Sequence, residues 1–556
     1  MPNYLGRYRS SLLVCACVVA CYLVTTAVAA KEVSAYYVSA SAGNDNNDGR
    51  TEKTPWASLD RVVSQRLAPG DTVRFRAGDR FIGQLIIDES GAPDAVITFT
   101  SYGDGEKPIL DAAPMEKGSA VATVVINDQD YIEIEGLEIQ NFRRKSLRGV
   151  RDVDAFGILV RNTGKRFLKG FEFHNLTVQN IYPIKLKKHF DSTSVSGIRF
   201  ETLPAKTYKD AVNTSEIYLH NNVLRHTGRF GMSLRHRPSK VDRLAGLPVN
   251  YDVNVRITGN TCEHLGGSCV LMNGVYNGLL EGNIFLRSGS TIQAERSVQR
   301  GSGAWFFRSR HIVAQKNVAI SSRGHNDSSG IHVDYGNEDI LVQYNFLYDN
   351  EGYGTEILGK NKNIIWRYNI SVGDGTRRIK VPRPDGKTSH HAGKTVFVSD
   401  FSVPRRIQSR GVYIYNNTYV TAANSQPGIE INSVDTHIIN NIFVASPNSH
   451  MGHRVKIGWN DVQIARNAFS GSIAPAFIAR DSRPLLADIS FVGEASAVGT
   501  YALPSRYHAE LRGQSLTHPS FPAAGKGILG HISEVPEVDF FNKPLDHDSP
   551  LVGAGY

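Results

Sequence analysis

Short runs of alternating apolar and polar residues dominate residues 71–469. Turns rich in Gly and Asn separate these runs, and no helical periodicity interrupts them. Ile132, Ile134 and Ile139, for example, show the period of two that is typical of a β-strand with one buried face. The pattern therefore predicts a chain built from many short strands.

Two similar units stand side by side in this region. One reads GIHVDYGNEDILVQYN from Gly330, and the next reads GTEILGKNKNIIWRYN, so that Asn345 and Asn369 are 24 residues apart. An asparagine recurs at the equivalent turn, 23 to 48 residues apart, at Asn222, Asn260, Asn283, Asn317, Asn345, Asn369, Asn417, Asn441 and Asn467. A period in the twenties with short strands is typical of a solenoid. The predicted fold class is all-β, a right-handed parallel β-helix in which the long gaps carry inserted loops.

The recurring asparagines have a structural explanation. Asn tolerates the left-handed conformation, and its side-chain amide can bond the amide and backbone of the next coil. These residues are therefore assigned to the scaffold and are not candidates for catalysis.

The chain divides into four predicted regions. Residues 1–29 form a signal peptide, residues 30–80 an N-terminal strand and capping helix, residues 81–475 the β-helix, and residues 476–556 a C-terminal cap and tail. The helix is expected to start at Pro55 and to place Trp56, Leu59 and Val62 on one face. Such a helix covers the open hydrophobic end of a solenoid.

The leader has a basic start with Arg7 and Arg9, an apolar run over residues 12–28, and an A-x-A cleavage signal at residues 27–29. A lipobox-like sequence that ends at Cys21 is an alternative, and so is a retained membrane anchor. A secreted or periplasmic protein is expected, with no membrane contact after the leader is removed.

Only two cysteines lie outside the leader, Cys262 and Cys269. They form either a local disulfide in an oxidising compartment or two free thiols stacked in the solenoid. A metal site at this pair is not expected, because only His264 lies nearby.

The formal net charge is +9. An exported basic protein favours anionic partners, and an acidic polysaccharide fits best because the basic residues are scattered and form no nucleic-acid-binding tail. A generally basic surface without a binding role is the alternative. A monomer is expected.

Alignment of the coils on their asparagines locates a candidate site. His332 lies thirteen residues before Asn345, and Glu356 lies thirteen residues before Asn369. Asp334 points to the same side as His332, because side chains alternate along a strand. Since coils stack about 4.8 Å apart, the three side chains are expected to form one exposed polar cluster.

Residues on the neighbouring strand and loops extend the candidate site. Asp327 is a further candidate catalytic residue, and the candidate substrate-binding residues are Trp305, Arg308, Arg323, His325 and Tyr353. Aromatic rings stack on sugar faces, and Arg pairs with carboxylates. The insertion TRRIKVPRPDGKTSHHAGK is expected either to wall the groove or to be a solvated loop.

Three segments near the N-terminus resemble a known family. They read YYVSASAGNDNNDGRTEKTPWASL, APGDTVRFRAGDRF and SYGDGEKPIL. They resemble the alginate lyase and chondroitin lyase branch of the right-handed parallel β-helix, pectate-lyase-like superfamily. The resemblance implies a polysaccharide bound in a groove along one sheet. It specifies the architecture more than the activity, because this fold hosts lyases, hydrolases, epimerases and tailspikes.

Two mechanisms fit the candidate residues, and the basic net charge favours the first, a lyase. His332 would abstract the proton next to a uronate carboxylate, Arg308 or Arg323 would neutralise that carboxylate, and Tyr353 would act as the acid. In the alternative, a glycoside hydrolase, the carboxyl groups are drawn from Asp334, Glu356 and Asp327.

Calcium is an open alternative as a cofactor of the lyase, since hard cations choose oxygen ligands. An epimerase shares the proton abstraction of a lyase. A non-catalytic polysaccharide-binding β-helix is the remaining alternative.

Overall fold

The computed structural model describes residues 33–186, 193–204, 210–236, 251–378, 381–382, 388–389, 391–458, 461–491, 494 and 496–556. The contacts separate Met1–Glu32 from one compact unit, Val33–Tyr556. The predicted signal peptide lies outside the described residues, as does most of the insertion after Gly375. In the described part of the chain, no helix is both long enough and apolar enough to cross a membrane.

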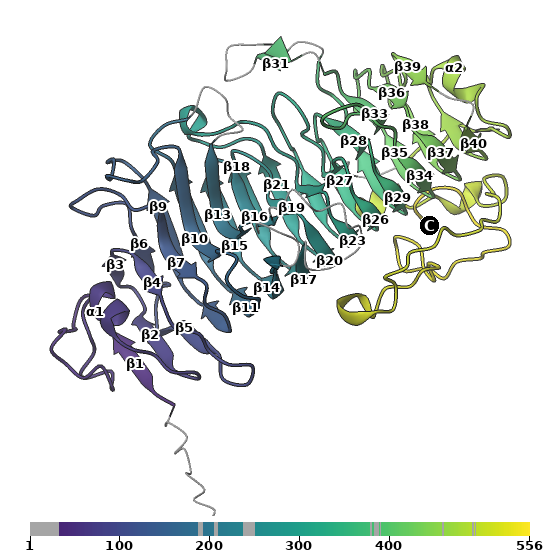
Figure 1. The fold of residues 1–556 in the computed structure, drawn as a ribbon. Helices are drawn as coiled ribbons and strands as arrows, with labels where there is room; N and C mark the ends of the chain where they lie inside the picture. Colours follow the sequence, from purple (N-terminus) through teal and green to yellow (C-terminus); the bar gives the residue numbers. More distant parts are fainter. Residues whose placement is uncertain are drawn as a thin grey trace, which may run out of the picture. The chain divides into compact units, whose positions relative to one another are not determined.

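Three long parallel sheets build the unit Val33–Tyr556, and each complete coil of the chain contributes one strand to each sheet (Figure 1). One coil consists of β26 (Glu338–Gln343), β27 (Phe346–Tyr348) and β28 (Tyr353–Ile357). We name the sheets that contain these strands A, B and C. Within the described residues, sheets A and B have 14 strands each and sheet C has 12. The predicted right-handed parallel β-helix is confirmed.

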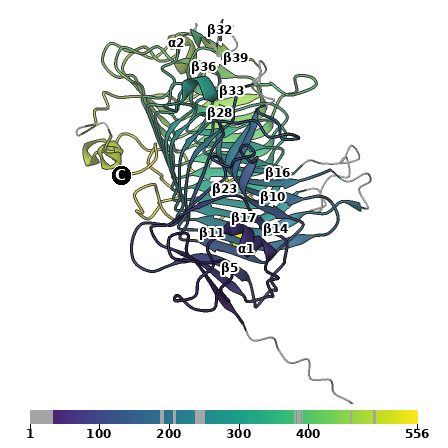
Figure 2. The same ribbon diagram turned by 90° about the vertical axis from the view of Figure 1, so that its left-hand side faces the viewer.

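Period-two alternation produces the core. In β25 (Ile331–Val333), Ile331 and Val333 are fully buried inside the coils, and they pack with Ile340 and Val342 of β26. In-register parallel pairing repeats this arrangement from coil to coil (Figure 2). The core is therefore a continuous apolar column, and the residues that alternate with the core residues along each strand point outward.

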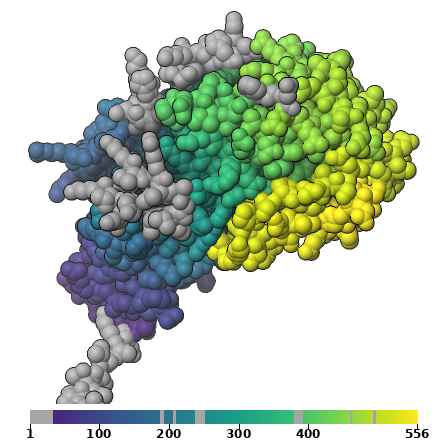
Figure 3. All heavy atoms as spheres, turned by 45° about the vertical axis from the view of Figure 1, so that its right-hand side comes forward, coloured from purple at the N-terminus to yellow at the C-terminus, as the bar shows by residue number. Residues whose placement is uncertain are grey.

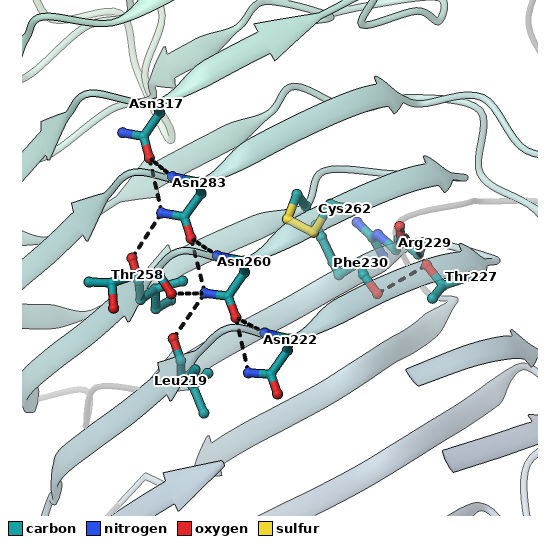
Figure 4. The surroundings of a disulfide bond; sticks show 12 residues. Leu219, Asn222, Thr227, Arg229, Phe230, Thr258, Asn260, Cys262, Asn283 and Asn317 are labelled. Carbon is teal, nitrogen blue, oxygen red and sulfur yellow. Dashed lines mark hydrogen bonds between the residues drawn. A yellow bond between two sulfur atoms is a disulfide. The ribbon is translucent and has the colours of Figure 1, made fainter. Parts of the chain in front are cut away.

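The asparagine ladder runs from Asn222 to Asn467 at one corner of the coils. Each side-chain Nδ2 donates to the Oδ1 of the next ladder Asn at 2.9–3.0 Å (Figure 4). Asn467 ends the series by donating to Asp481 Oδ2 at 2.8 Å. The predicted scaffold role is confirmed, because these amides are buried and bond to one another.

One detail of the ladder prediction is wrong. The left-handed conformation falls on the residue before each ladder Asn, such as Lys316 (φ 54°), Tyr344 (φ 56°) and Tyr368 (φ 50°). The ladder amide must point inward to reach the next coil. The residue before it, whose side chain points outward, therefore makes the turn.

The N-terminal helix is shorter than expected. Helix α1 spans Leu59–Ser64, and Ser58 caps it by accepting a hydrogen bond from the Arg61 N–H. Trp56 lies before the helix, fully buried in a bridge to Val38. The expected start at Pro55 is therefore wrong, since the chain is extended up to Ser58.

Cys262 and Cys269 form a disulfide (Figure 4). Both residues are fully buried. Of the two alternatives that the sequence left open, the disulfide is the one present.

The C-terminal segment does more than close the last coil. After α2 (Pro475–Ile478) and β42 (Leu485–Leu486), the chain runs back along the outside of sheet A, where it is yellow in Figures 1 and 3. Phe521 and Leu529 are buried there against Leu341 and Ile365 of sheet A. A part of sheet A that would otherwise face solvent is thereby covered.

Candidate active site

One register position of sheet C carries the candidate site. Trp305 of β22 (Ala304–Phe307) pairs with His332 of β25, which pairs with Glu356 of β28, which pairs with Phe397 of β33 (Lys394–Val398). The neighbours Ile331 and Val333 point into the core, so this row points outward. The alignment on asparagines thus placed His332 and Glu356 correctly beside each other.

The row points outward, yet it is not exposed. His332 and Glu356 are each 1% exposed, and Asp334 is 6% exposed. The expectation of an exposed cluster is therefore wrong. The indole of Trp305 stacks on the His332 ring, with centroids 5.6 Å apart and planes 3° apart.

His332 lies at the centre of three carboxyl groups. Its Nε2 is 3.5 Å from Glu356 Oε1, and Glu356 Oε2 accepts a hydrogen bond from the Ser329 hydroxyl at 2.5 Å. One ligand atom each of Asp327, His332 and Glu356 lie within 4.8 Å of one another. Asp334, two residues along the strand, accepts hydrogen bonds from Trp305 Nε1 and its own neighbour's N–H, both at 2.8 Å.

Two arginines that the sequence reasoning missed hold Asp327. Arg300 donates to its carboxylate from Nε at 2.7 Å and from Nη2 at 3.3 Å, and Arg377 Nη2 donates to its backbone carbonyl at 3.1 Å. A signal for Arg300 was present, because it precedes Asp327 by 27 residues, the spacing of one coil that also separates Trp305 from His332. Arg377 belongs to the insertion that was expected either to wall the groove or to be a solvated loop.

Burial and charge set the proton affinities of the cluster. Burial acts to lower the pKa of His332, but the three carboxylates around it outweigh this effect and raise that pKa. Burial raises the pKa of Glu356 to about 7, against the charge of His332. Burial also raises the pKa of Asp334. For Asp327 burial acts in the same direction, but the charges of Arg300 and His332 outweigh it and lower the pKa below its usual range.

The other predicted binding residues, Tyr353, Arg308, Arg323 and His325, lie in different surroundings. Tyr353 is 2% exposed, and its ring lies under Lys394 Nζ at 5.0 Å. Arg308 is exposed and lies over the Phe307 ring. Among the described residues, Arg323 is paired with Asp349 at 2.5 Å and not with a carboxylate of the cluster. His325 is buried in the same turn.

This arrangement can share protons among carboxyl groups. Asp327, His332 and Glu356 are also close enough to hold a metal ion together. Calcium does not fit them well, because it takes six to eight oxygen ligands, whereas one of the three is a histidine and Asp327 is already paired with Arg300. Carboxyl groups whose pKa values are pushed apart are typical of acid–base chemistry.

Comparisons with known proteins agree with the fold. No family model matches the chain. The chain is 25% identical over 475 residues to a lacto-N-biosidase of Bifidobacterium longum subsp. longum, in an alignment that covers 72% of this chain and 30% of that protein. A solved GH136 lacto-N-biosidase from Eubacterium ramulus superposes with a TM-score of 0.53 at 19% identity, covering 82% of this chain and 68% of the other. This likeness shows the fold alone, a parallel β-helix, as predicted.

The preference for a lyase is wrong. The curated relative, at 25% identity, is a lacto-N-biosidase, which is a glycoside hydrolase. This relative favours the hydrolase that the sequence analysis kept as an alternative. The chain spans only about 30% of the length of the curated relative that it matches.

Proposed function

We propose that this chain is a glycoside hydrolase and that Asp327 and Asp334 act on the glycosidic bond. The observation that carries the proposal is the convergence of carboxyl groups around His332 on the outer face of sheet C. Glycoside hydrolysis uses two such groups, one as the acid and one as the base or nucleophile. The two pKa values shift in opposite directions, which keeps one group ionised and favours a proton on the other.

Exposure selects this pair from the three carboxyl groups. The Asp327 side chain is 12% exposed, whereas those of His332 and Glu356 are 1% and 2% exposed. A group that touches substrate must be reached from outside. Asp334 bonds the indole of Trp305, which is itself half-buried and offers a face for a sugar ring. We infer that Glu356 and His332 lie beneath the reacting pair and set its charge.

The relatives suggest the first substrate to test. A lacto-N-biosidase is the curated relative, so we propose an oligosaccharide that ends in lacto-N-biose as the lead substrate. The net charge of +9 supports adding acidic glycans to the panel. Export of the chain remains our proposal, and the buried disulfide supports it because disulfides persist in oxidising compartments.

The test is digestion of this panel by the purified mature protein. We expect new reducing ends without the ultraviolet absorbance at about 230–240 nm that an unsaturated sugar would give. Asp327→Asn and Asp334→Asn should each lower kcat by about 10²–10⁴-fold. Asp435→Asn, at a carboxylate that is 45% exposed on sheet A, is the matched control and should keep full activity.

Substrates with a good leaving group assign the two roles. A variant that lacks only the proton donor should regain its bond-cleaving step on an aryl glycoside, because that leaving group needs no proton. A variant that lacks the nucleophile or base should stay inactive on the same compound. Full activity of both variants on the natural glycan, or cleavage of no glycan in the panel, would overturn the proposal.

A further inference from the structure

A second cluster of ligating side chains lies on the outer face of sheet A, away from the carboxyl groups on sheet C. Glu133 and Glu135 lie on β8 (Ile132–Glu135), and His174 lies on β11 (Leu168–His174). Glu135 and His174 are register partners, and Glu133 is two residues away on the same side. The pleat of the sheet therefore presents both carboxylates to one imidazole.

The distances suit a small metal ion. His174 Nε2 lies 3.1 Å from Glu133 Oε1 and 3.6 Å from Glu135 Oε2, and one ligand atom from each residue lies within 4.8 Å of the others. Zinc bonds of 2.0–2.1 Å place tetrahedral ligands about 3.3 Å apart. The two distances from His174 Nε2 are thus already close to those that the ligand atoms would have around zinc.

Each of these ligands is oriented by a neutral neighbour. On β5 (Ile97–Tyr102), the Thr98 hydroxyl donates to Glu133 Oε2 and the Thr100 hydroxyl to Glu135 Oε1, both at 2.9 Å. The Asn175 side-chain amide lies 3.1 Å from His174 Nδ1. After a flip of that amide, its oxygen can accept the Nδ1 proton while Nε2 binds a metal. Hydrogen bonds of this kind fix the orientation of metal ligands in known sites.

The charge of this cluster is uncompensated. Across the described residues, no Lys or Arg lies within ion-pair distance of Glu133 or Glu135, and His174 is the one group that can balance them. A divalent cation would remove the repulsion between the two carboxylates.

We propose that Glu133, Glu135 and His174 bind one divalent transition-metal ion, with zinc as the preferred ion. Mixed nitrogen and oxygen ligands suit zinc, whereas calcium prefers oxygen alone. Three protein ligands leave a fourth position for water. His220 stacks on His174 with centroids 4.7 Å apart and planes 5° apart. Glu172, His174 and His220 form a second set of ligand atoms within 4.8 Å of one another, so loss of binding in His220→Ala alone would assign the ion to that set.

The experiment is a zinc titration of the chelator-treated mature protein by calorimetry, with the thermal midpoint measured in parallel. We expect one ion per chain and a rise in the midpoint, because binding to the folded state alone stabilises it. His174→Ala and the double variant Glu133→Gln, Glu135→Gln should each weaken binding by at least about tenfold. Cobalt in place of zinc should give the absorbance of a bound low-symmetry ion in the wild type and lose it in these variants.

The matched control is His437→Ala. His437 lies on the same face of sheet A with one carboxylate, Asp435, at 3.0 Å, and its loss should leave zinc binding unchanged. The proposal is overturned if the wild type binds no zinc at millimolar concentration. It is equally overturned if binding survives in His174→Ala, or if binding is lost only in a His332→Ala or His220→Ala variant. Glycan cleavage plays no part in these readouts, so the result does not depend on the proposed function.

Discussion

At the scale of single residues, Glu356 controls the charge of the buried cluster. Its pKa of about 7 in the folded chain lies above the ordinary value of 4.5. Between these two pH values the folded protein keeps a proton that the unfolded chain releases, so stability falls as the pH rises through this window. Below pH 4.5 both states hold the proton, and this stabilising contribution is fully present. The raised pKa of His332 acts with the same sign.

The variant Glu356→Gln tests this reasoning, because Gln has no proton to lose. We expect the thermal midpoint of the variant, relative to that of the wild type, to improve steadily from pH 4.5 to about 7. Thermal unfolding followed by circular dichroism across this range measures the difference. Asp435→Asn should show no such trend. A constant difference between wild type and Glu356→Gln would mean that Glu356 is already ionised throughout.

Sequence spacing predicts part of this cluster for a physical reason. Coils stack in register, so His332 and Glu356 had to be neighbours once the asparagines were aligned. Their burial could not be predicted in the same way, because it depends on contacts such as the stacking of Trp305 on His332 and on the loops that precede β25. Loop conformations carry no period, and their contacts depend on residues that are distant in the sequence.

At the scale of structural elements, the ladder corner carries a large share of the stability. Asn345 donates to Ala314 O, Gln343 O and Asn369 Oδ1, each at 2.9 Å, and it accepts from Asn317. All these groups are buried. Each one left without a partner costs about 1–3 kcal/mol.

We therefore expect Asn345→Ala to lower the free energy of unfolding by about 3 kcal/mol or more. Denaturant unfolding measures this change. The same experiment on Asn46→Ala gives the control, because Asn46 is exposed in a loop and, within the described residues, its side chain makes no hydrogen bond. Equal stability of Asn345→Ala and the wild type would show that water replaces the lost amide.

Strands and their order were predictable because alternation and the coil period are local properties of the sequence. Which residue of each ladder turn adopts the left-handed conformation was not predictable in this way. Both Tyr344 and Asn345 lie in the turn, and only the need for the Asn345 amide to reach the next coil decides between them.

At the scale of the whole unit Val33–Tyr556, the C-terminal segment acts as an outer cover of sheet A. Arg367 anchors it by donating to Glu534 O at 2.7 Å and Ser533 O at 3.1 Å, and the Tyr344 hydroxyl donates to Val538 O at 2.9 Å. The Pro- and Gly-rich sequence of this segment indicates irregular structure. It does not show where the segment packs, because that depends on side chains of sheet A that are far away in the sequence.

If this cover is part of the folded core, then Phe521 should matter as much as a residue inside the coils. Phe521 is 1% exposed and packs against Leu341 and Ile365. Phe521→Ala should lower the free energy of unfolding by about 3–5 kcal/mol, the cost of a large cavity. Val535→Ala, at a position that is 44% exposed in the same segment, should change it by less than about 0.5 kcal/mol. Two separate unfolding transitions in the Phe521 variant, with loss of the segment first, would instead show that the cover detaches independently of the coils.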